Sequence, residues 1–131
     1  MKRTAKIIRS ADDGKRHIAV DTENWDEILE FLKSKNLIKK FDLICQVIFS
    51  GLRNSDLYDK EDINDRCKHV TAMKFKGSIN ARIYCKEVKQ KDKTLVIITS
   101  ELLENKKNQK NKHKEITLIE KVSNYDYDIE E

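Results

Sequence analysis

The fold is decided by the stretch Val70-Thr71-Ala72-Met73-Lys74-Phe75-Lys76-Gly77-Ser78-Ile79-Asn80-Ala81-Arg82-Ile83-Tyr84. Apolar and polar residues alternate on both sides of Gly77-Ser78, which is the pattern of two half-buried strands joined by a turn. One face of this pair is expected to be buried and carries Thr71, Met73, Phe75, Ile79, Ala81, Ile83 and Cys85. The other face is polar and largely basic. The stretch therefore predicts an antiparallel strand pair with one core face.

The segment before this pair predicts a hairpin followed by two helices. Two short apolar-bearing runs, residues 4–9 and 17–20, flank Asp13-Gly14, a strong hairpin-turn signal. Helical spacing of apolar residues predicts a first helix from about Asn24 to Lys35, with Glu27 completing a pattern like a capping box. A second helix, capped by Asn36, is predicted to end near Gly51. Residues 57–68 predict an irregular connection with at most one short helical turn.

The segment after the pair predicts one central strand and one more helix. Leu95-Val96-Ile97-Ile98 is a continuous apolar run, as expected for a strand buried on both faces. Ile116, Ile119 and Val122 follow at helical spacing, and residues 126–131 form an acidic tail. The predicted fold class is α+β: a helical hairpin on a mainly antiparallel sheet, with a C-terminal helix.

Size and composition narrow the class of protein. The 131 residues suit a single domain, residues 1–131, with a modest core, and charged residues make up 38% of the chain. No apolar run approaches the roughly 20 residues of a membrane span, so we expect a cytoplasmic protein. Cys45, Cys67 and Cys85 are far apart, which favours reduced thiols over a disulfide framework or a zinc site, and we expect Cys45 and Cys85 to lie in the core.

The predicted elements resemble the RelE/ParE superfamily of bacterial toxins, and two segments carry the specific likeness. Residues 70–84 are similar to that family's paired strands, in which a basic "L-R-F-K-G" type strand turns into one bearing "A-R-I-x-Y". Lys106-Lys107-Asn108-Gln109-Lys110-Asn111 is similar to the HigB-type "K-K-T-Q-K-T-P" segment. The resemblance covers roughly the second half of the chain. It implies a HigB-like toxin of a type II toxin–antitoxin system, a ribosome-dependent mRNA endoribonuclease.

Cleavage of RNA at an internal phosphodiester requires three kinds of catalytic assistance. The 2′-hydroxyl must be activated, the phosphorane stabilised and the leaving 5′-oxygen protonated. The resemblance implies that clustered Arg, Lys and Tyr or His side chains do this on the open face of the sheet, and no metal or organic cofactor is expected. The candidate catalytic residues, which can share one face if the strands pair across Gly77-Ser78, are Lys74, Lys76, Arg82 and Tyr84.

Each candidate has an expected role. Arg82 is the best candidate for stabilising the phosphorane, because a guanidinium is planar, bidentate and always charged. Lys74 and Lys76 would hold flanking phosphates or shift a proton, and Tyr84 would stack a base or act as an acid. The same side chains also suit a solvated face without function. If Arg82 lies on an open face, Arg82→Ala should hardly change the melting temperature.

The basic run after the third strand is the candidate RNA-binding segment, with Lys106, Lys107, Lys110, Lys112, His113 and Lys114. Lysines bind phosphate by charge and counterion release with little sequence preference, which suits ribosomal RNA better than sequence readout. A solvated loop and first helical turn explain the run equally well. Net charge is only +4, but acid and base are separated along the chain.

Two other functions remain open at this point. A ParE-like relative would inhibit DNA gyrase by binding it, and a non-catalytic relative would only bind RNA or protein. The basic face favours the ribonuclease weakly. The expected partners are the ribosome with its mRNA and a cognate antitoxin, which would form a toxin–antitoxin hetero-oligomer.

Overall fold

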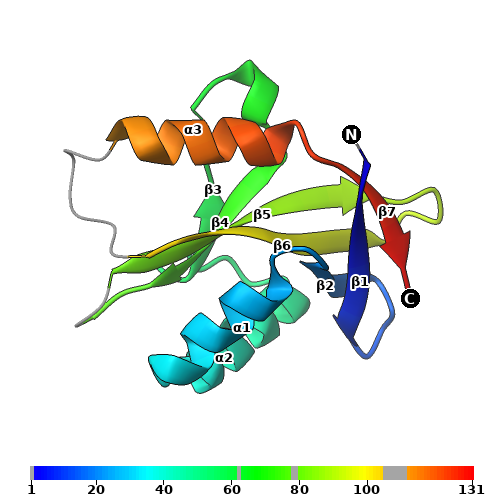
Figure 1. Cartoon of the computed structure of the whole chain (residues 1–131). Helices are drawn as coiled ribbons and strands as arrows, with labels where there is room; N and C mark the ends of the chain where they lie inside the picture. The colour runs from blue at the N-terminus through cyan, green and yellow to red at the C-terminus, as the bar shows by residue number, and fades with distance from the viewer. Residues whose placement is uncertain (1, 62, 78–79, 105–111) are drawn as a thin grey trace.

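A mixed seven-stranded sheet with helices on both faces forms the protein (Figure 1). The computed structural model describes residues 2–61, 63–77, 80–104 and 112–131. Its elements in chain order are β1 (Lys2–Ser10), β2 (Arg16–Asp21), α1 (Trp25–Ser34), α2 (Ile38–Ser50), β3 (Tyr58–Lys60), the 3₁₀ turn η1 (Asp65–Cys67), β4 (Val70–Phe75), β5 (Ala81–Lys89), β6 (Leu95–Leu103), α3 (Lys112–Ser123) and β7 (Asp126–Glu130). The fold class predicted from the sequence is confirmed.

The sheet order is β3-β4-β5-β6-β2-β1-β7. Two neighbouring pairs, β2 with β6 and β1 with β7, are parallel, and the other neighbours are antiparallel. β4 and β5 pair as predicted, with Met73 opposite Ile83 and Lys74 opposite Arg82. β6 lies between β5 and β2, so the apolar run at its start forms a central strand, as its composition predicted.

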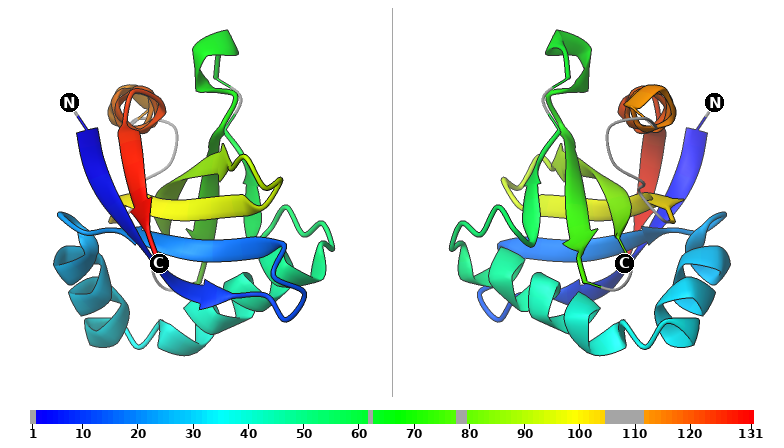
Figure 2. Two further views of the ribbon diagram at one scale, coloured as in Figure 1. Left: turned by 90° about the vertical axis from the view of Figure 1, so that its right-hand side faces the viewer. Right: turned by 90° about the vertical axis from the view of Figure 1, so that its left-hand side faces the viewer.

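The two faces of the sheet carry separate apolar clusters. The face under α1 and α2 buries the described members of the predicted set of β4 and β5, including Met73 and Ile83, together with Cys45 and Cys85. Ile79 of that set lies outside the described residues. The opposite face packs against α3, whose Ile119 and Val122 are buried. Figure 2 shows the two N-terminal helices and α3 on opposite sides of the strands. A third, smaller cluster joins β1 and β7 to β6.

Turns follow the expected glycine chemistry in two places. Gly14 has φ of +71° in the β1–β2 turn, and Gly51 has φ of +73° at the end of α2, a left-handed conformation that suits a residue without Cβ. The predicted cap position is correct for α1, without the expected side-chain bond, and wrong for α2. Asn24 precedes α1, but its side chain donates to Ser100 and Glu101 of β6 instead of capping the helix, and α2 begins after Leu37 rather than at Asn36.

Two strands were absent from the sequence prediction. β3 lies within the predicted irregular connection, at one edge of the sheet, and the predicted helical turn is η1. The acidic tail is not a loose end, since its residues 126–130 form β7 beside β1 at the other edge. In β7 the residues Tyr127 and Ile129 face the core, while the acidic residues that alternate with them are exposed.

Candidate nucleic-acid interface

The β4–β5 register brings predicted site residues onto one face of the sheet. Lys74 lies opposite Arg82, and Tyr84 is two residues along β5 on the same face, opposite Ala72. Lys76 directly follows the end of β4. The sequence therefore predicted the common face of Lys74, Arg82 and Tyr84 correctly.

That face is not open, because α3 covers part of it. Tyr84 is fully buried, and its hydroxyl lies 3.3 Å from Oε1 of Glu115 in the first turn of α3. Burial, reinforced by the nearby Glu115 carboxylate, raises the pKa of Tyr84 well above its ordinary value. The expectation that Tyr84 stacks a base or acts as an acid on an exposed surface is wrong for this structure, since a buried neutral phenol cannot reach a nucleic acid.

The direction of α3 is fixed by contacts at both of its ends. Its first turn meets Tyr84, whereas Lys86 donates from β5 to the carbonyls of Ser123, at 3.2 Å, and Tyr125 at its C-terminal end. A lysine at a helix C-terminus satisfies carbonyls that have no partner within the helix. The N-terminus of α3 therefore points toward the end of β4 and the start of β5 (Figure 1).

Basic side chains from the β4–β5 pair and from α3 consequently lie at this end of the molecule. Lys74 comes from β4, Lys76 directly follows it, and Arg82 comes from β5. His113 and Lys114 come from the exposed start of α3. We call this group of five the cationic end. Of the other predicted RNA-binding residues, Lys106, Lys107 and Lys110 lie outside the described residues, and Lys112 is the first residue of α3.

Arg82 is held by a carboxylate that the sequence analysis missed. Its guanidinium Nη1 donates to Oε1 of Glu61 at 2.5 Å, and both side chains are mostly buried, with 16% and 15% of their surface exposed. The expectation of a freely solvated Arg82 is therefore wrong. Glu61 follows β3 and lies 21 residues from Arg82, so no local sequence pattern linked the two residues.

The two lysines are more accessible. Lys74 Nζ donates to the carbonyl of Ser55 at 2.9 Å, and Lys76 lies 3.4 Å from the Asp56 carboxylate with 56% of its side chain exposed. Exposed ion pairs of this length contribute about 0–1 kcal/mol, so phosphate could replace Asp56 at little cost.

A second polar cluster lies at the opposite end of β6 from the β5–β6 turn. The Asp21 carboxylate is fully buried and accepts from Arg3 at 2.7 and 3.1 Å, from Tyr127 at 2.7 Å and from two backbone N–H groups. Glu101 accepts from Asn24 and from the Tyr125 hydroxyl. Within the described chain no buried side-chain nitrogen or oxygen lacks a partner, so this cluster is a satisfied structural network.

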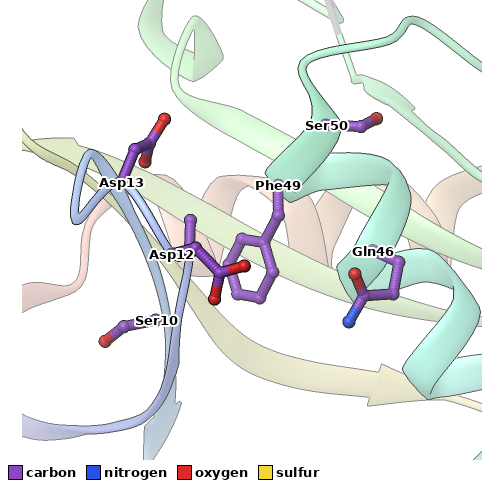
Figure 3. A pocket seen from close by; sticks show the side chains of 7 residues that line it. Ser10, Asp12, Asp13, Gln46, Phe49 and Ser50 are labelled. Atoms are coloured by element: carbon purple, nitrogen blue, oxygen red, sulfur yellow. The ribbon is translucent and has the colours of Figure 1, made fainter.

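One cavity away from the cationic end is lined partly by acidic residues. A cavity of about 390 Å³ lies between the β1–β2 turn and the end of α2, with Asp12, Asp13 and Phe49 among its lining residues (Figure 3). Its carboxylates do not suit a phosphate ligand. Among the residues that the structure describes, no group of His, Cys, Asp and Glu is arranged to hold a metal ion, and no helix is long and apolar enough to cross a membrane.

No protein-family model, no curated protein and no solved structure matches this chain.

Proposed function

We propose that the chain is an RNA-directed toxin of the RelE/HigB type, a ribosome-dependent mRNA endoribonuclease that acts through its cationic end. The observation that carries the proposal is the convergence of Lys74, Lys76 and Arg82 with the exposed start of α3. Clustered cations attract the phosphate backbone and release its counterions. The resemblance of the two basic segments to the toxin family supports the same function.

The site offers two groups for the chemistry. The Arg82 fork suits phosphate oxygens as charge develops in the transition state. The Glu61 carboxylate, in contact with Arg82, is placed to accept a proton from a 2′-hydroxyl once Arg82 turns to phosphate. Substrate must therefore compete with Glu61 for Arg82. Lys74 and Lys76 would hold the flanking phosphates, and the leaving 5′-oxygen would take its proton from water. Tyr84 has a structural role only.

A non-catalytic RNA-binding protein of the same fold is the second candidate. It is favoured by the ion pair that occupies Arg82 and by the burial of Tyr84, because both reduce the number of groups ready for acid–base chemistry. Such a protein would bind RNA through the same cationic end. Cleavage, rather than binding, separates the two candidates.

Expression of the chain in cells, followed by mapping of mRNA 5′ ends, tests the proposal. New 5′ ends that depend on Arg82 support the endoribonuclease. RNA association without new ends supports the binding protein, and a DNA-damage response without cuts would favour a gyrase inhibitor of the ParE kind. A cognate antitoxin is part of the proposal, and its gene should neighbour this one. Harmless expression of a solitary gene would contradict the toxin assignment.

A further inference from the structure

β7 leaves one of its two backbone edges unpaired within the described chain. It is the last strand in the sheet order, and its single neighbour there is β1. An exposed row of N–H and C=O groups can add an extended segment of another protein by main-chain hydrogen bonds. The five residues of β7 offer about 16 Å of edge at about 3.3 Å per residue. This is long enough for a short added strand.

A cavity lies on this free side of β7. It has a volume of about 470 Å³, and its lining includes Asp126 and Tyr127 of β7 and, across from them, Val88, Lys89 and Leu95 of the β5–β6 hairpin. No residue of β1, the paired neighbour of β7, lines it. An added strand would therefore have room for its inward side chains, and Val88, Leu95 and Tyr127 offer them apolar contact.

The outer face of β7 sets the charge of the added strand. Asp126, Asp128 and Glu130 are exposed and alternate with the inward Tyr127 and Ile129. Opposite charges facing each other across neighbouring strands stabilise the pair, and like charges destabilise it.

The neighbouring strand β1 already shows this charge complementarity with β7. β1 places Lys2 beside Asp126 and Lys6 beside Glu130, and Lys2 Nζ lies 3.4 Å from the Asp128 carboxylate. A strand on the free side would meet the same row of carboxylates. A second copy of β7 would place acid against acid, so self-pairing of this edge is disfavoured.

We propose that the free edge of β7 binds an extended segment of a partner protein in which basic and apolar residues alternate. The basic residues face Asp126, Asp128 and Glu130, and the apolar residues enter the cavity beside the β5–β6 hairpin. This interaction is separate from the proposed RNA function, because the edge lies at the C-terminal end of α3 and the cationic end at its N-terminal end.

The test uses a fluorescent peptide of alternating lysine and valine, about seven residues long to span the strand. Binding to the full chain is followed by anisotropy, and backbone chemical shifts locate the contact. We expect the peptide to bind and to shift the amides of β7. A peptide with N-methyl groups on every amide keeps the charge but cannot donate along either edge, so it should not bind. Glutamate in place of lysine should also abolish binding.

Two matched variants of the chain complete the test. Asp128→Lys should weaken binding about tenfold, whereas Glu30→Lys, which reverses an exposed acid on α1, should leave it unchanged. Both positions are exposed, so both variants should fold. Equal binding of the N-methylated peptide, equal effects of the two variants, or no binding of the unmodified peptide would each overturn the proposal.

Discussion

Replacing Asp21 by Asn should be one of the most destabilising isosteric changes in this protein. The Asp21 carboxylate is fully buried and takes two bonds from Arg3, whose side chain is only 11% exposed. The amide keeps the shape but removes the charge, which leaves the Arg3 cation in a poorly hydrated place. Breaking a buried ion pair by removing one partner costs about 3–5 kcal/mol. Small domains are stable by only about 5–15 kcal/mol, so much of the stability should be lost.

Glu23 provides a matched control on the same guanidinium. Its carboxylate lies 2.7 Å from Arg3, the same distance as that of Asp21, but its side chain is 59% exposed. Glu23→Gln should therefore cost about 0–1 kcal/mol. The comparison separates the effect of burial from the effect of distance.

Urea unfolding followed by circular dichroism measures both changes. With a slope of about 2 kcal/mol per molar urea, Asp21→Asn should lower the midpoint by roughly 1.5–2.5 M and Glu23→Gln by less than about 0.5 M. Equal shifts for the two variants would refute the reasoning, because they would show that the buried network does not depend on the Asp21 charge.

Three further outcomes are expected. Arg82→Ala should lower the cleavage rate by roughly 10²–10³-fold, and Arg82→Lys should restore little of that rate because lysine lacks the planar guanidinium fork. The alanine variant should also lose about 1.5–3 kcal/mol of stability, because it loses the bond to Glu61, and unchanged cleavage by the folded variant would contradict a catalytic role for Arg82. Tyr84→Phe should leave RNA cleavage unchanged, since the hydroxyl is buried, and a large loss of activity would show that α3 moves away from it. Burial raises the folded-state pKa of all four tyrosines, Tyr58, Tyr84, Tyr125 and Tyr127, so the stability that their neutral form contributes is present below the unfolded-state pKa near 10 and is lost as pH rises above it; the lowered pKa of Lys86 opposes this loss only weakly. In a spectrophotometric titration the phenols should ionise together with unfolding, and their gradual ionisation in a folded chain near pH 10 would contradict this prediction.

The secondary-structure elements with a regular pattern of apolar residues could be predicted from the sequence. Alternation across residues 70–84 predicted the β4–β5 pair and its core face, and the continuous apolar run predicted β6 as a central strand. These patterns are reliable because a shift of one residue would expose the whole apolar set.

The position of α3 could not be predicted in the same way. The apolar residues Ile119 and Val122 show that the helix needs a surface to cover, but they do not say which surface. Ala72 and Tyr84 alternate with core residues and were assigned to an open face, and only the folded chain shows that α3 covers them. The ion pair of Arg82 with Glu61 depends on the same tertiary arrangement.

The sequence of β7 has the alternation of a strand, but its acidic composition led to the prediction of a tail. Asp126-Tyr127-Asp128-Ile129-Glu130 alternates with the period of a strand, but three carboxylates in five residues suggested a solvated tail. The parallel pairing with β1, in which Lys2 and Lys6 face these acids, is a long-range contact between the two ends of the chain. β3, with three residues, is too short for any period to identify.

The central claim is tested most directly by incubating the purified chain with programmed ribosomes and mapping the 5′ ends of the mRNA by primer extension. The account predicts new ends within the mRNA that appear with the wild-type chain, persist with Tyr84→Phe and are lost with Arg82→Ala protein that circular dichroism shows to be folded. Intact mRNA with the wild-type chain, or the same cuts with folded Arg82→Ala, would contradict an endoribonuclease site at the cationic end.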